Sequence, residues 1–313
     1  MKKLISVVLA LVLCLGLAAC GGAESGSVSG NSADFTVGVC QLMEHPSLDQ
    51  ATEGFVAALT KAVEAAGKTV AIDKQVAGGT DLCTTVINTF TSKNVDLIMG
   101  NATPALLAAA NATTEIPVLG TSVTDYADTF GGTIPANVSG TSDAVPFDEQ
   151  AKMMIQSLSL VSGDKVGVLY CADESNSLFQ YNAVKALFEA EGIVVEAYTF
   201  SEVTELEALV NSMVAECKAV YVPSDNTVAQ NDTIVGDICT ENNIPVYTSY
   251  GGTICYASLA IDYYKLGEET GAMAADILLG NKTVTDIEVM TLTPTVTYNQ
   301  ELCQKLGIVV PEN

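Results

Sequence analysis

The chain repeats one strand–helix pattern, and this duplication restricts the folds that it can adopt. In the first copy, short apolar runs alternate with helical stretches; the expected strands are 35–40, 69–74, 95–100 and 116–120, and the expected helices are 48–67, 81–93 and 103–113. The first helix carries Phe55, Leu59 and Val63 at a four-residue spacing and ends at Gly67. Strands that alternate with helices in this way predict a parallel sheet covered on both faces.

The second copy begins at "KVGVLY" (165–170), which matches "TVGVCQ" (36–41). Further along, "KAVYVPSDNT" (218–227) matches "VDLIMGNAT" (95–103), and equivalent segments recur at offsets of about 120 to 130 residues, as in an internal duplication. The chain has 313 residues, of which 49% are hydrophobic, so it can bury the cores of two lobes. We therefore expect an α/β fold of two similar lobes, each a doubly wound parallel sheet.

The duplication also predicts where a ligand would bind. In an open parallel sheet, ligands bind beyond the carboxyl ends of the strands. Ser224 to Thr227 follow one such strand, and Asn101 to Thr103 follow the matching strand of the first copy. If the lobes face each other, these loops line one cleft, together with the loop pairs 41–48 and 171–178, and 121–126 and 248–252. Asp225 and Thr103 also precede helices, where they can act as caps, but a helix N-terminus is itself an anion site.

The first twenty residues have the features of an export signal. Lys2 and Lys3 precede an apolar run from Leu4 to Leu17 that is too short to span a bilayer. The run ends in Leu17-Ala18-Ala19-Cys20, which resembles a bacterial lipobox, although an ordinary signal peptide with an incidental cysteine is the alternative. We expect 1–19 to be removed, Cys20 to be lipidated and 20–34 to form a flexible tether. The protein would then lie on the outer face of the cell membrane, attached to it only through lipid.

Charge and cysteine spacing exclude several kinds of function. The net charge is −24 and all thirteen basic residues are lysines, so the chain has no basic surface for nucleic acid. Of the nine cysteines, Cys14 lies in the signal and Cys20 takes lipid; the other seven show no C-x-x-C spacing for zinc or redox chemistry. We expect no metal and no cofactor.

Several motifs in this order resemble one known family: "VGVCQLMEHPSLD", "GNATPA", "TSVTD", "GTSDAVPFDEQ", "VGVLYCADESNS", "YVPSDNTVA" and "DYYKLGEETG". The resemblance is to the extracytoplasmic solute-binding lipoproteins of ABC transporters with the type I periplasmic-binding fold, in the branch that resembles tryptophan- and other aromatic-amino-acid-binding proteins. It extends from about Phe35 to the end of the chain. Tyr126, where a proline is usual, and "YGGTICYAS" (250–258) depart from the pattern.

The resemblance implies two lobes joined by three crossover strands, near 141–147, 255–260 and 288–292. It divides the chain into lobe 1, with 35–142 and 258–289, and lobe 2, with 143–257 and 290–313. It also implies a monomer that captures a small solute by hinge closure and works with the permease and ATPase subunits of an ABC importer. A lipoprotein that senses its ligand for a partner receptor is the alternative, as is the capture of a sugar or nucleoside.

The resemblance places ligand-binding residues on the cleft loops: Gln41, Glu44, Asn101, Thr103, Ser122, Thr124, Asp143, Asn176, Asp225, Asn226 and Asp262. Tyr126, Tyr250 and Phe147 are candidate pocket walls. Carboxylates can bind an ammonium, and hydroxyls, amides and helix N-termini can bind a carboxylate, so these residue types suit an amino acid. Without any arginine in the chain, backbone N–H groups with Ser122 or Thr124 would hold the ligand carboxylate, and Asp225 is the expected ammonium partner.

Other interpretations remain open for individual residues. His45, the single histidine, either orders the loop before the first helix or contacts the ligand, and Asp143 either caps "AVPFDEQ" or binds ligand. Tyr263 and Tyr264 are expected to serve packing rather than the pocket. An enzyme is not expected, because the chain lacks G-x-S-x-G and phosphate-loop motifs and Cys40, the possible nucleophile beside His45, lies in a buried strand pattern.

Overall fold

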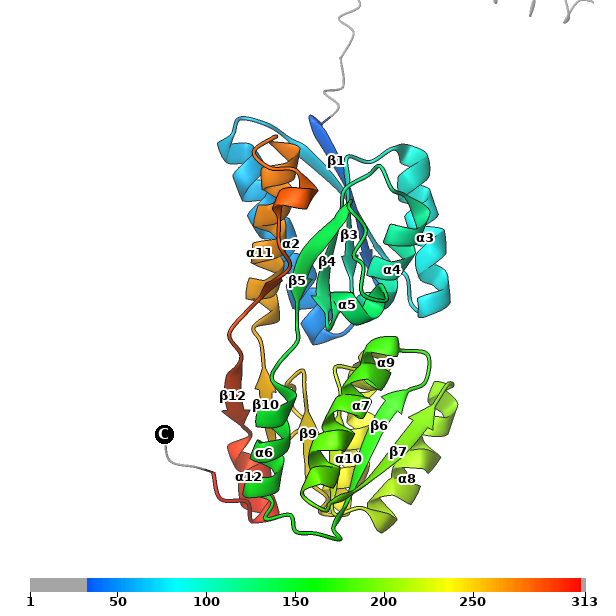
Figure 1. The fold of residues 1–313 in the computed structure, drawn as a ribbon, viewed down its shortest axis with the longest axis vertical. Coiled ribbons are helices and arrows are strands. Elements are labelled where there is room, and N and C mark those ends of the chain that lie inside the picture. Colours follow the sequence, from blue (N-terminus) through cyan, green and yellow to red (C-terminus); the bar gives the residue numbers. More distant parts are fainter. Residues whose placement is uncertain (1–32, 311–313) are drawn as a thin grey trace, which may run out of the picture. The chain divides into compact units, whose positions relative to one another are not determined.

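The computed structural model describes residues 33–310, which form two α/β lobes (Figure 1). The expected signal segment 1–19, the lipidated Cys20 and nearly all of the tether 20–34 lie outside the described residues. Lobe 1 contains the strands β1 (Phe35–Gln41), β2 (Val70–Val76), β3 (Leu97–Asn101), β4 (Val118–Val123), β5 (Val138–Ser142) and β11 (Met290–Thr291). Lobe 2 contains β6 (Lys165–Cys171), β7 (Val194–Phe200), β8 (Ala219–Val222), β9 (Val246–Thr248), β10 (Ala257–Ala260) and β12 (Thr295–Tyr298).

Helices cover both faces of each sheet (Figure 1). Those of lobe 1 are α2 (Pro46–Ala65), α3 (Thr80–Lys93), α4 (Thr103–Ala112), α5 (Tyr126–Thr129) and α11 (Tyr263–Leu278), with the 3₁₀ turn η2 (Val284–Asp286). Those of lobe 2 are α6 (Phe147–Ser157), α7 (Ser175–Ala190), α8 (Leu206–Glu216), α9 (Asn226–Gln230), α10 (Asp232–Glu241) and α12 (Gln300–Leu306), with the 3₁₀ turn η1 (Val203–Glu205).

The two sheets have the same strand order, which confirms the expected pair of similar α/β lobes. Lobe 1 runs β11-β5-β4-β3-β1-β2, and lobe 2 runs β12-β10-β9-β8-β6-β7. Each strand of one sheet therefore has a counterpart in the other. The pairs are parallel except that β12 runs antiparallel to β10. Because β3 and β8 occupy equivalent positions, the loops that follow them are equivalent too.

The chain crosses between the lobes after β5, after β10 and after β11. The expected division assigned most of Ala257–Ala260 to lobe 1 and Met290–Thr291 to lobe 2. The strand order places β10 in the sheet of lobe 2 and β11 in the sheet of lobe 1. The chain therefore leaves lobe 2 after β10, not before it, and leaves lobe 1 after β11, not before it.

Alternating side chains along the strands build the core of lobe 1. Val37 and Val39 of β1 pack with Phe55 on one face of the sheet, under α2 and α11. Cys40 of the same strand packs with Ile87 on the other face, under α3. Successive strand residues point to opposite faces, so a sheet covered on both sides needs apolar residues at consecutive positions.

Helices α2 and α11 pack at unusually short range because small residues face each other. A Cβ atom at Gly54 would overlap the carbonyl oxygen of Tyr264, and one at Gly267 would overlap that of Ala51. The same is true of Gly271 on α11, next to Phe55. Glycine at these positions lets the backbones of the two helices touch, so α11, which is late in the sequence, forms part of the lobe 1 core.

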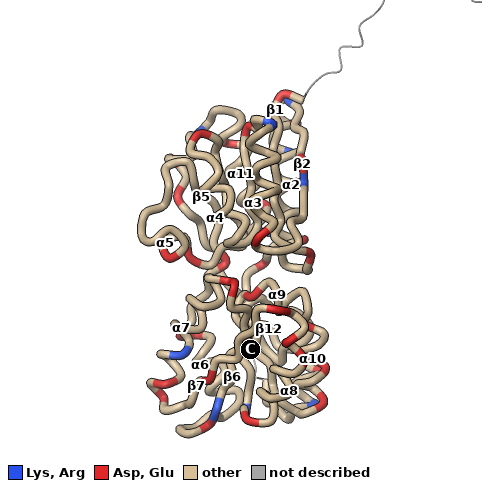
Figure 2. Tube along the Cα trace, turned by 90° about the vertical axis from the view of Figure 1, so that its right-hand side faces the viewer, with Lys and Arg blue, Asp and Glu red and all other residues tan. Residues whose placement is uncertain are grey.

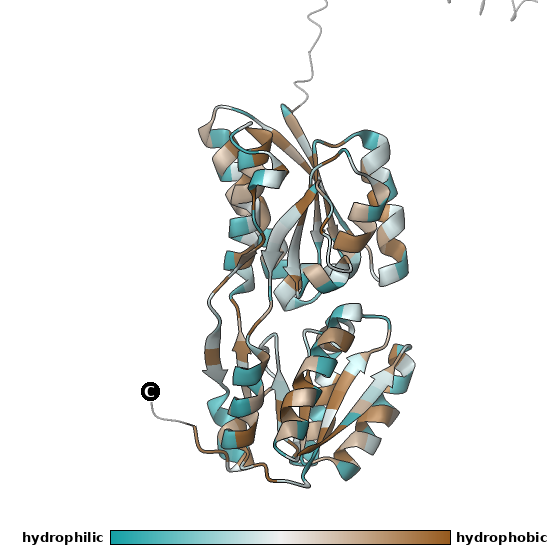
Figure 3. Cartoon of the chain, in the orientation of Figure 1, coloured by the Kyte–Doolittle hydropathy of each residue, from teal (hydrophilic) through white to brown (hydrophobic). Residues whose placement is uncertain are grey.

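Charge and hydropathy are distributed as the composition suggests. Acidic residues occur over both lobes and basic residues are few (Figure 2). Teal and brown segments alternate along the helices, which have polar outer and apolar inner faces (Figure 3). Across residues 33–310, no helix is long and apolar enough to cross a membrane.

Candidate functional site

A small buried cavity lies between the loops of the two lobes, at the carboxyl ends of their strands. Its free volume is about 10 Å³, which is room for about one water molecule. A solute of ordinary size could therefore enter only when the lobes move apart. Both lobes and the first crossover contribute to its lining, which comprises His45, Leu48, Ser122, Asp143, Ser224, Asp225, Asn226, Ala229, Tyr250 and Tyr263. None of these side chains is a lysine, so the two aspartates have no cationic partner in the lining.

Three polar atoms of this lining have no hydrogen-bond partner among the described residues. They are Ser122 Oγ, Asp143 Oδ1 and the Tyr250 hydroxyl, and each is buried. A buried polar atom without a partner costs about 1–3 kcal/mol, so native structures rarely contain several in one place. Their convergence on one cavity makes it the candidate site for a polar ligand.

Asp143 is the electrostatic centre of the cavity. It directly follows β5 and is 5% exposed. Its Oδ2 accepts a hydrogen bond from the Tyr263 hydroxyl at 3.0 Å, and its Oδ1 accepts none. Burial raises the pKa of this carboxyl, against the lowering effect of the Tyr263 bond. A ligand cation at Oδ1 would supply the charge that the protein itself does not provide.

Asp225, the expected ammonium partner, is already fully bonded. Its Oδ1 caps α9 by accepting from Val228 N at 2.8 Å, and its Oδ2 accepts from Cys171 N at 2.8 Å and Ser177 Oγ at 2.7 Å. Burial and the nearby charge of Glu174 raise its pKa well above the usual range. Asp225 therefore lines the cavity as a structural residue, and Asp143 is the better candidate for binding an ammonium.

Glu174 stabilises the rest of the same loop. Its carboxylate accepts from the backbone and side chain of both Asn226 and Thr227, at distances of 2.6–2.9 Å. Asn176 donates to the carbonyl oxygen of Ser224 at 2.8 Å, while its own Oδ1 has no partner in the described chain. Glu174 was not expected from the sequence, because a glutamate before a helix gives no sign of facing inward.

Hydrogen bonds across the cavity hold the lobes together. Within residues 33–310, three such bonds join loops of lobe 1 to helices α7 and α9 of lobe 2: His45 Nε2 to Asn226 Oδ1 at 3.2 Å, Gln180 Nε2 to Thr124 Oγ1 at 3.1 Å, and Gln230 Nε2 to the carbonyl oxygen of Glu44 at 3.4 Å. His45 thus directly precedes α2 and lines the cavity.

Two residues of lobe 1, Ser122 near the end of β4 and Ala102 before α4, have strained backbone conformations. Ser122 has φ +55° and Ala102 has φ +87°, in a region that costs residues with a Cβ about 1–2 kcal/mol. Ala102 precedes α4 without a side-chain cap, and the Thr103 hydroxyl beside it is buried without a partner among the described residues. Strain together with unpartnered groups is typical of ligand-binding loops.

The remaining expected residues lie near the cavity but outside its lining. Gln41 and Asn101 belong to an internal network: Thr52 Oγ1 donates to Gln41 Oε1 at 2.7 Å and accepts from Asn101 Nδ2 at 2.9 Å. Glu44 and Asp262 are exposed, and Asp262 caps α11 by accepting from the backbone of Lys265. These side chains shape or border the site rather than face it.

Among the candidate walls, only Tyr250 lines the cavity. Tyr126 is buried under β5, where its hydroxyl donates to the carbonyl oxygen of Thr141, and Phe147 packs edge-on against Phe179 in lobe 2. Tyr264 is 39% exposed. Tyr263 is buried in a hydrophobic core cluster, as the packing interpretation expects, and it also lines the cavity, where its hydroxyl donates to Asp143. The sequence signal for Tyr263 was its position at the start of α11, three residues after the end of β10.

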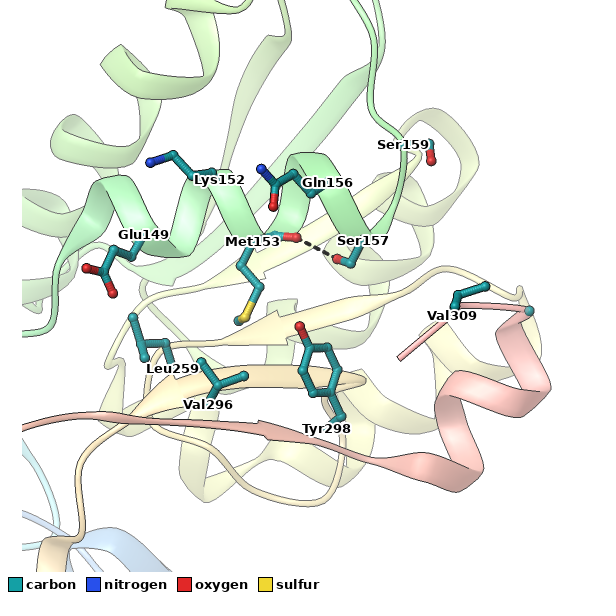
Figure 4. Close-up of a pocket in the computed structure, with 11 residues that line it drawn as sticks. Glu149, Lys152, Met153, Gln156, Ser157, Ser159, Leu259, Val296, Tyr298 and Val309 are labelled. Atoms are coloured by element: carbon teal, nitrogen blue, oxygen red, sulfur yellow. Dashed lines mark hydrogen bonds between the residues drawn. The ribbon is translucent and has the colours of Figure 1, made fainter. Parts of the chain in front are cut away.

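A larger hollow lies on the outer side of lobe 2, between α6 and β12 (Figure 4). Its volume of about 1180 Å³ includes open solvent, and Met153 points from α6 toward Leu259 and Val296. None of its lining residues carries a buried unpartnered polar atom in the described chain. Hence the small cavity, not the larger hollow, is the candidate site.

The possible nucleophile Cys40 faces away from water. It is fully buried in β1, and the neighbouring Cys83 together with burial raises its pKa far above that of an ordinary thiol. The thiolate needed for attack is therefore disfavoured. In residues 33–310, no group of three or more His, Cys, Asp or Glu side chains is arranged to hold a metal ion.

Comparison with known proteins shows which family has this architecture. Residues 36–313 match the family described as "ABC transporter substrate binding protein". The chain belongs to this family. A tyrosine-binding protein of Clostridioides difficile (strain R20291) is 33% identical to it over 326 aligned residues, covering 98% of this chain and 93% of the relative. Members of this substrate-binding family are solute-binding proteins that act outside the cytoplasm.

Two solved structures of substrate-binding proteins are similar over most of the chain. One is the ABC domain of a Streptococcus pneumoniae protein in complex with L-Trp, with 30% identity, coverage of 88% of this chain and 96% of that one, and a TM-score of 0.80. The other is the ligand-free, open structure of a substrate-binding protein with adhesive properties from Clostridium difficile, with 34% identity, coverage of 89% and 97%, and a TM-score of 0.66.

The fold is the type I periplasmic-binding fold, as expected. The structure is more similar to the L-Trp complex than to the open protein, although the open protein has the higher sequence identity.

Proposed function

We propose that the protein captures an aromatic amino acid, such as tyrosine or tryptophan, between its lobes and delivers it to an ABC importer. The observation that carries the proposal is Asp143, a buried carboxylate with one oxygen unpartnered among the described residues and no lysine in the cavity lining. A buried charge is stable only when it is paired, and an α-ammonium group is the natural partner.

The other end of the ligand would meet neutral donors. Ser122 Oγ faces the cavity, and the uncapped N-terminus of α4 lies in the neighbouring loop with the Thr103 hydroxyl. Hydroxyls and free backbone N–H groups can hold a carboxylate where no arginine is present. Tyr250, Tyr263 and Leu48 supply aromatic and aliphatic surface for a side chain. The tyrosine-binding relative and the L-Trp complex support the same ligand class.

A binding panel tests the ligand class. The twenty amino acids, common sugars and nucleosides are added to the purified protein and followed by thermal shift and calorimetry. Aromatic amino acids should raise the unfolding temperature, because a ligand at about 100 times its Kd adds about 2.7 kcal/mol to the stability of the folded state. Micromolar binding of a sugar or nucleoside, with no binding of any amino acid, would contradict the proposal.

Import, anchoring and closure need their own measurements. Cells that lack the protein should take up less of the labelled amino acid, whereas loss of a sensing lipoprotein would leave uptake intact.

Cys20→Ala should release the monomeric protein from the membrane, or leave it unprocessed, without altering ligand affinity. Scattering should show a more compact protein with ligand than without it, as hinge closure requires.

A further inference from the structure

Tyr250 is the lining residue of lobe 2 whose side-chain polar atom is buried without a partner in the described chain. It lies two residues after β9 and is 8% exposed. By contrast, Asp225 accepts three hydrogen bonds, and the side-chain amide of Asn226 bonds to Glu174 and His45. The Tyr250 hydroxyl is therefore a group of lobe 2 that remains available to a ligand.

The other two lining atoms without partners among the described residues, Ser122 Oγ and Asp143 Oδ1, belong to adjacent strand ends of lobe 1. Strands β4 and β5 are paired, and Asp143 N donates to the carbonyl oxygen of Val123 at 3.1 Å. Tyr263 of α11, also in lobe 1, donates to the second oxygen of Asp143. When the lobes move apart, Ser122 and Asp143 therefore stay with lobe 1, and the Tyr250 hydroxyl moves away from them with lobe 2.

This division matches an amino acid that has a third polar group. The α-ammonium and the α-carboxylate are attached to the same carbon, so neighbouring groups of one lobe can hold both, Asp143 the ammonium and Ser122 the carboxylate. The side chain then points across the cavity toward lobe 2. A side chain with a hydroxyl or an N–H group would satisfy the Tyr250 hydroxyl, since a phenol both donates and accepts. Phenylalanine has no such group and would leave that hydroxyl buried without a partner.

The turn after β9 holds the Tyr250 ring in place. It belongs to "YGGTICYAS" (250–258), the segment that departs from the family pattern. Gly251 and Gly252 have φ +84° and +101°, values that favour glycine. A Cβ atom at Gly252 would lie 3.7 Å from Cε2 of Tyr250, so the turn folds back against the ring. Burial, with the nearby charge of Asp232, raises the pKa of Tyr250 well above its usual value, and the hydroxyl keeps its proton.

We propose that Tyr250 is the specificity-determining residue of the cavity: its hydroxyl bonds to the ligand side chain and selects an aromatic amino acid with a hydroxyl or N–H group, such as tyrosine or tryptophan, over phenylalanine. The inference rests on the proposed function, because it requires an amino acid between the lobes. It adds that lobe 1 binds the α-ammonium and α-carboxylate, which all amino acids share, and that lobe 2 distinguishes their side chains.

The size of the selectivity follows from the cost of a buried hydroxyl that has lost its partner. Leaving one side of a buried hydrogen bond unsatisfied lowers affinity by about five- to 150-fold. Removing the polar group on both sides is nearly neutral, because no buried group is then left without a partner. Phenylalanine should therefore bind poorly to the unmodified protein, and Tyr250→Phe should remove most of its disadvantage.

Calorimetry with L-tyrosine, L-tryptophan and L-phenylalanine tests the inference. In the unmodified protein, the tighter of the first two should bind at least about ten-fold more tightly than L-phenylalanine. In Tyr250→Phe, the affinity for that ligand should fall about ten-fold, while the affinity for L-phenylalanine stays the same or rises. Tyr264→Phe removes a hydroxyl outside the cavity, from a side chain that is 39% exposed. It is the matched control and should leave all three affinities unchanged.

Tyr263→Phe separates selectivity from binding in general. The Tyr263 hydroxyl donates to Asp143 at 3.0 Å, so its loss should change the affinity for all three amino acids by a similar factor and preserve their order. Thermal unfolding of the ligand-free proteins adds a measurement that does not involve binding. Tyr250→Phe should be at least as stable as the unmodified protein, because the lost hydroxyl has no partner in the described chain.

The comparison of the three ligands on the unmodified protein needs no variant. Phenylalanine that binds as tightly as tyrosine and tryptophan would overturn the inference while leaving the proposed function intact. So would a Tyr250→Phe protein whose three affinities change by the same factor, which is the result expected if water rather than the ligand bonds to this hydroxyl. A less stable Tyr250→Phe protein with unchanged selectivity would overturn it too. If no amino acid binds the unmodified protein, the proposed function itself fails.

Discussion

The loops after β3 and β8 occupy equivalent positions in the two lobes but differ in how far their polar groups are satisfied. After β8, Asp225 accepts three hydrogen bonds. Glu174 accepts hydrogen bonds from Asn226 and Thr227, which follow Asp225. After β3, Asn101 Oδ1 and Thr103 Oγ1 are buried without partners among the described residues, and the residue between them has a positive φ.

This difference shows that equivalent loops of two duplicated lobes can have different roles, one in stability and the other in ligand binding. The β8 loop is complete without a ligand, so it offers a rigid surface against which lobe 1 can close. The β3 loop and Ser122 of β4 contain buried polar atoms without partners among the described residues and backbone at positive φ. Of these atoms, Ser122 Oγ lines the cavity, where a ligand could bond to it. We therefore expect substitutions in the β8 loop to change stability and substitutions around the lobe 1 loops to change affinity.

The largest expected effect is the loss of stability in Asp225→Ala. Cys171 N, Ser177 Oγ and Val228 N would lose their acceptor inside the protein. We expect the free energy of unfolding to fall by about 3 kcal/mol or more, because each unsatisfied buried group costs about 1–3 kcal/mol and relief of the repulsion from Glu174 offsets only part of this. Urea unfolding measures the change.

Ser177→Ala is the control for that experiment, since it removes one of the three donors and should cost about 1 kcal/mol. If Asp225→Ala is as stable as the unmodified protein and instead fails to bind ligand, the two loops do not differ in the way that their hydrogen bonds indicate.

Asp143→Asn should show the opposite behaviour. The proposed charge-assisted bond to the ligand ammonium is worth about 1.5–3 kcal/mol, so affinity for an aromatic amino acid should fall at least ten-fold. Stability at neutral pH should be unchanged or higher, because an unpaired buried charge is removed. Calorimetry and urea unfolding on the same preparation separate the effects; a destabilised protein with normal affinity would contradict our assignment.

Ser122→Gly should lower affinity and raise stability at the same time. Glycine adopts φ +55° without strain, so the free energy of unfolding should rise by about 0.5 kcal/mol, whereas the lost hydroxyl should weaken binding several-fold. Ser122→Ala keeps the strain and should show the loss of affinity alone. Equal stability of the two variants would show that the backbone at this position is not strained.

The smallest effect is a paired comparison of two threonines. Thr227→Val removes a hydrogen bond to Glu174 and should cost about 1 kcal/mol of stability. Thr103→Val removes a hydroxyl that has no partner in the described chain, so stability should not fall. A similar loss in both proteins, measured by thermal unfolding, would remove the distinction between the loops.

The sequence predicted the fold because the duplication and the apolar runs are local features. The expected strand 35–40 agrees with β1, and the matched segments of the two copies are equivalent strands in the two sheets. The antiparallel β12 was not predicted, since "PTVTYNQ" carries no sign of its partner. The direction of a strand depends on which edge remains free after the other strands have paired.

The sequence predicted the loops of the site better than the side chains within them. Asp143 and Asp225 are both acidic residues that follow strands, and only the structure shows that backbone donors already occupy the oxygens of Asp225. Glu44 and Asp262 have suitable chemistry but point into solvent. The direction of a side chain depends on contacts between distant segments, which one sequence does not reveal.

The close packing of α2 with α11 has a consequence for how the chain acquires its structure. One face of the lobe 1 sheet is covered by α2 together with α11, which is made more than a hundred residues after β5. During synthesis, the first 150 residues therefore cannot complete their own core, and non-local contacts of this kind slow folding. The glycines thus fit a core that the chain can complete only after its last quarter, which contains α11, has begun to be made.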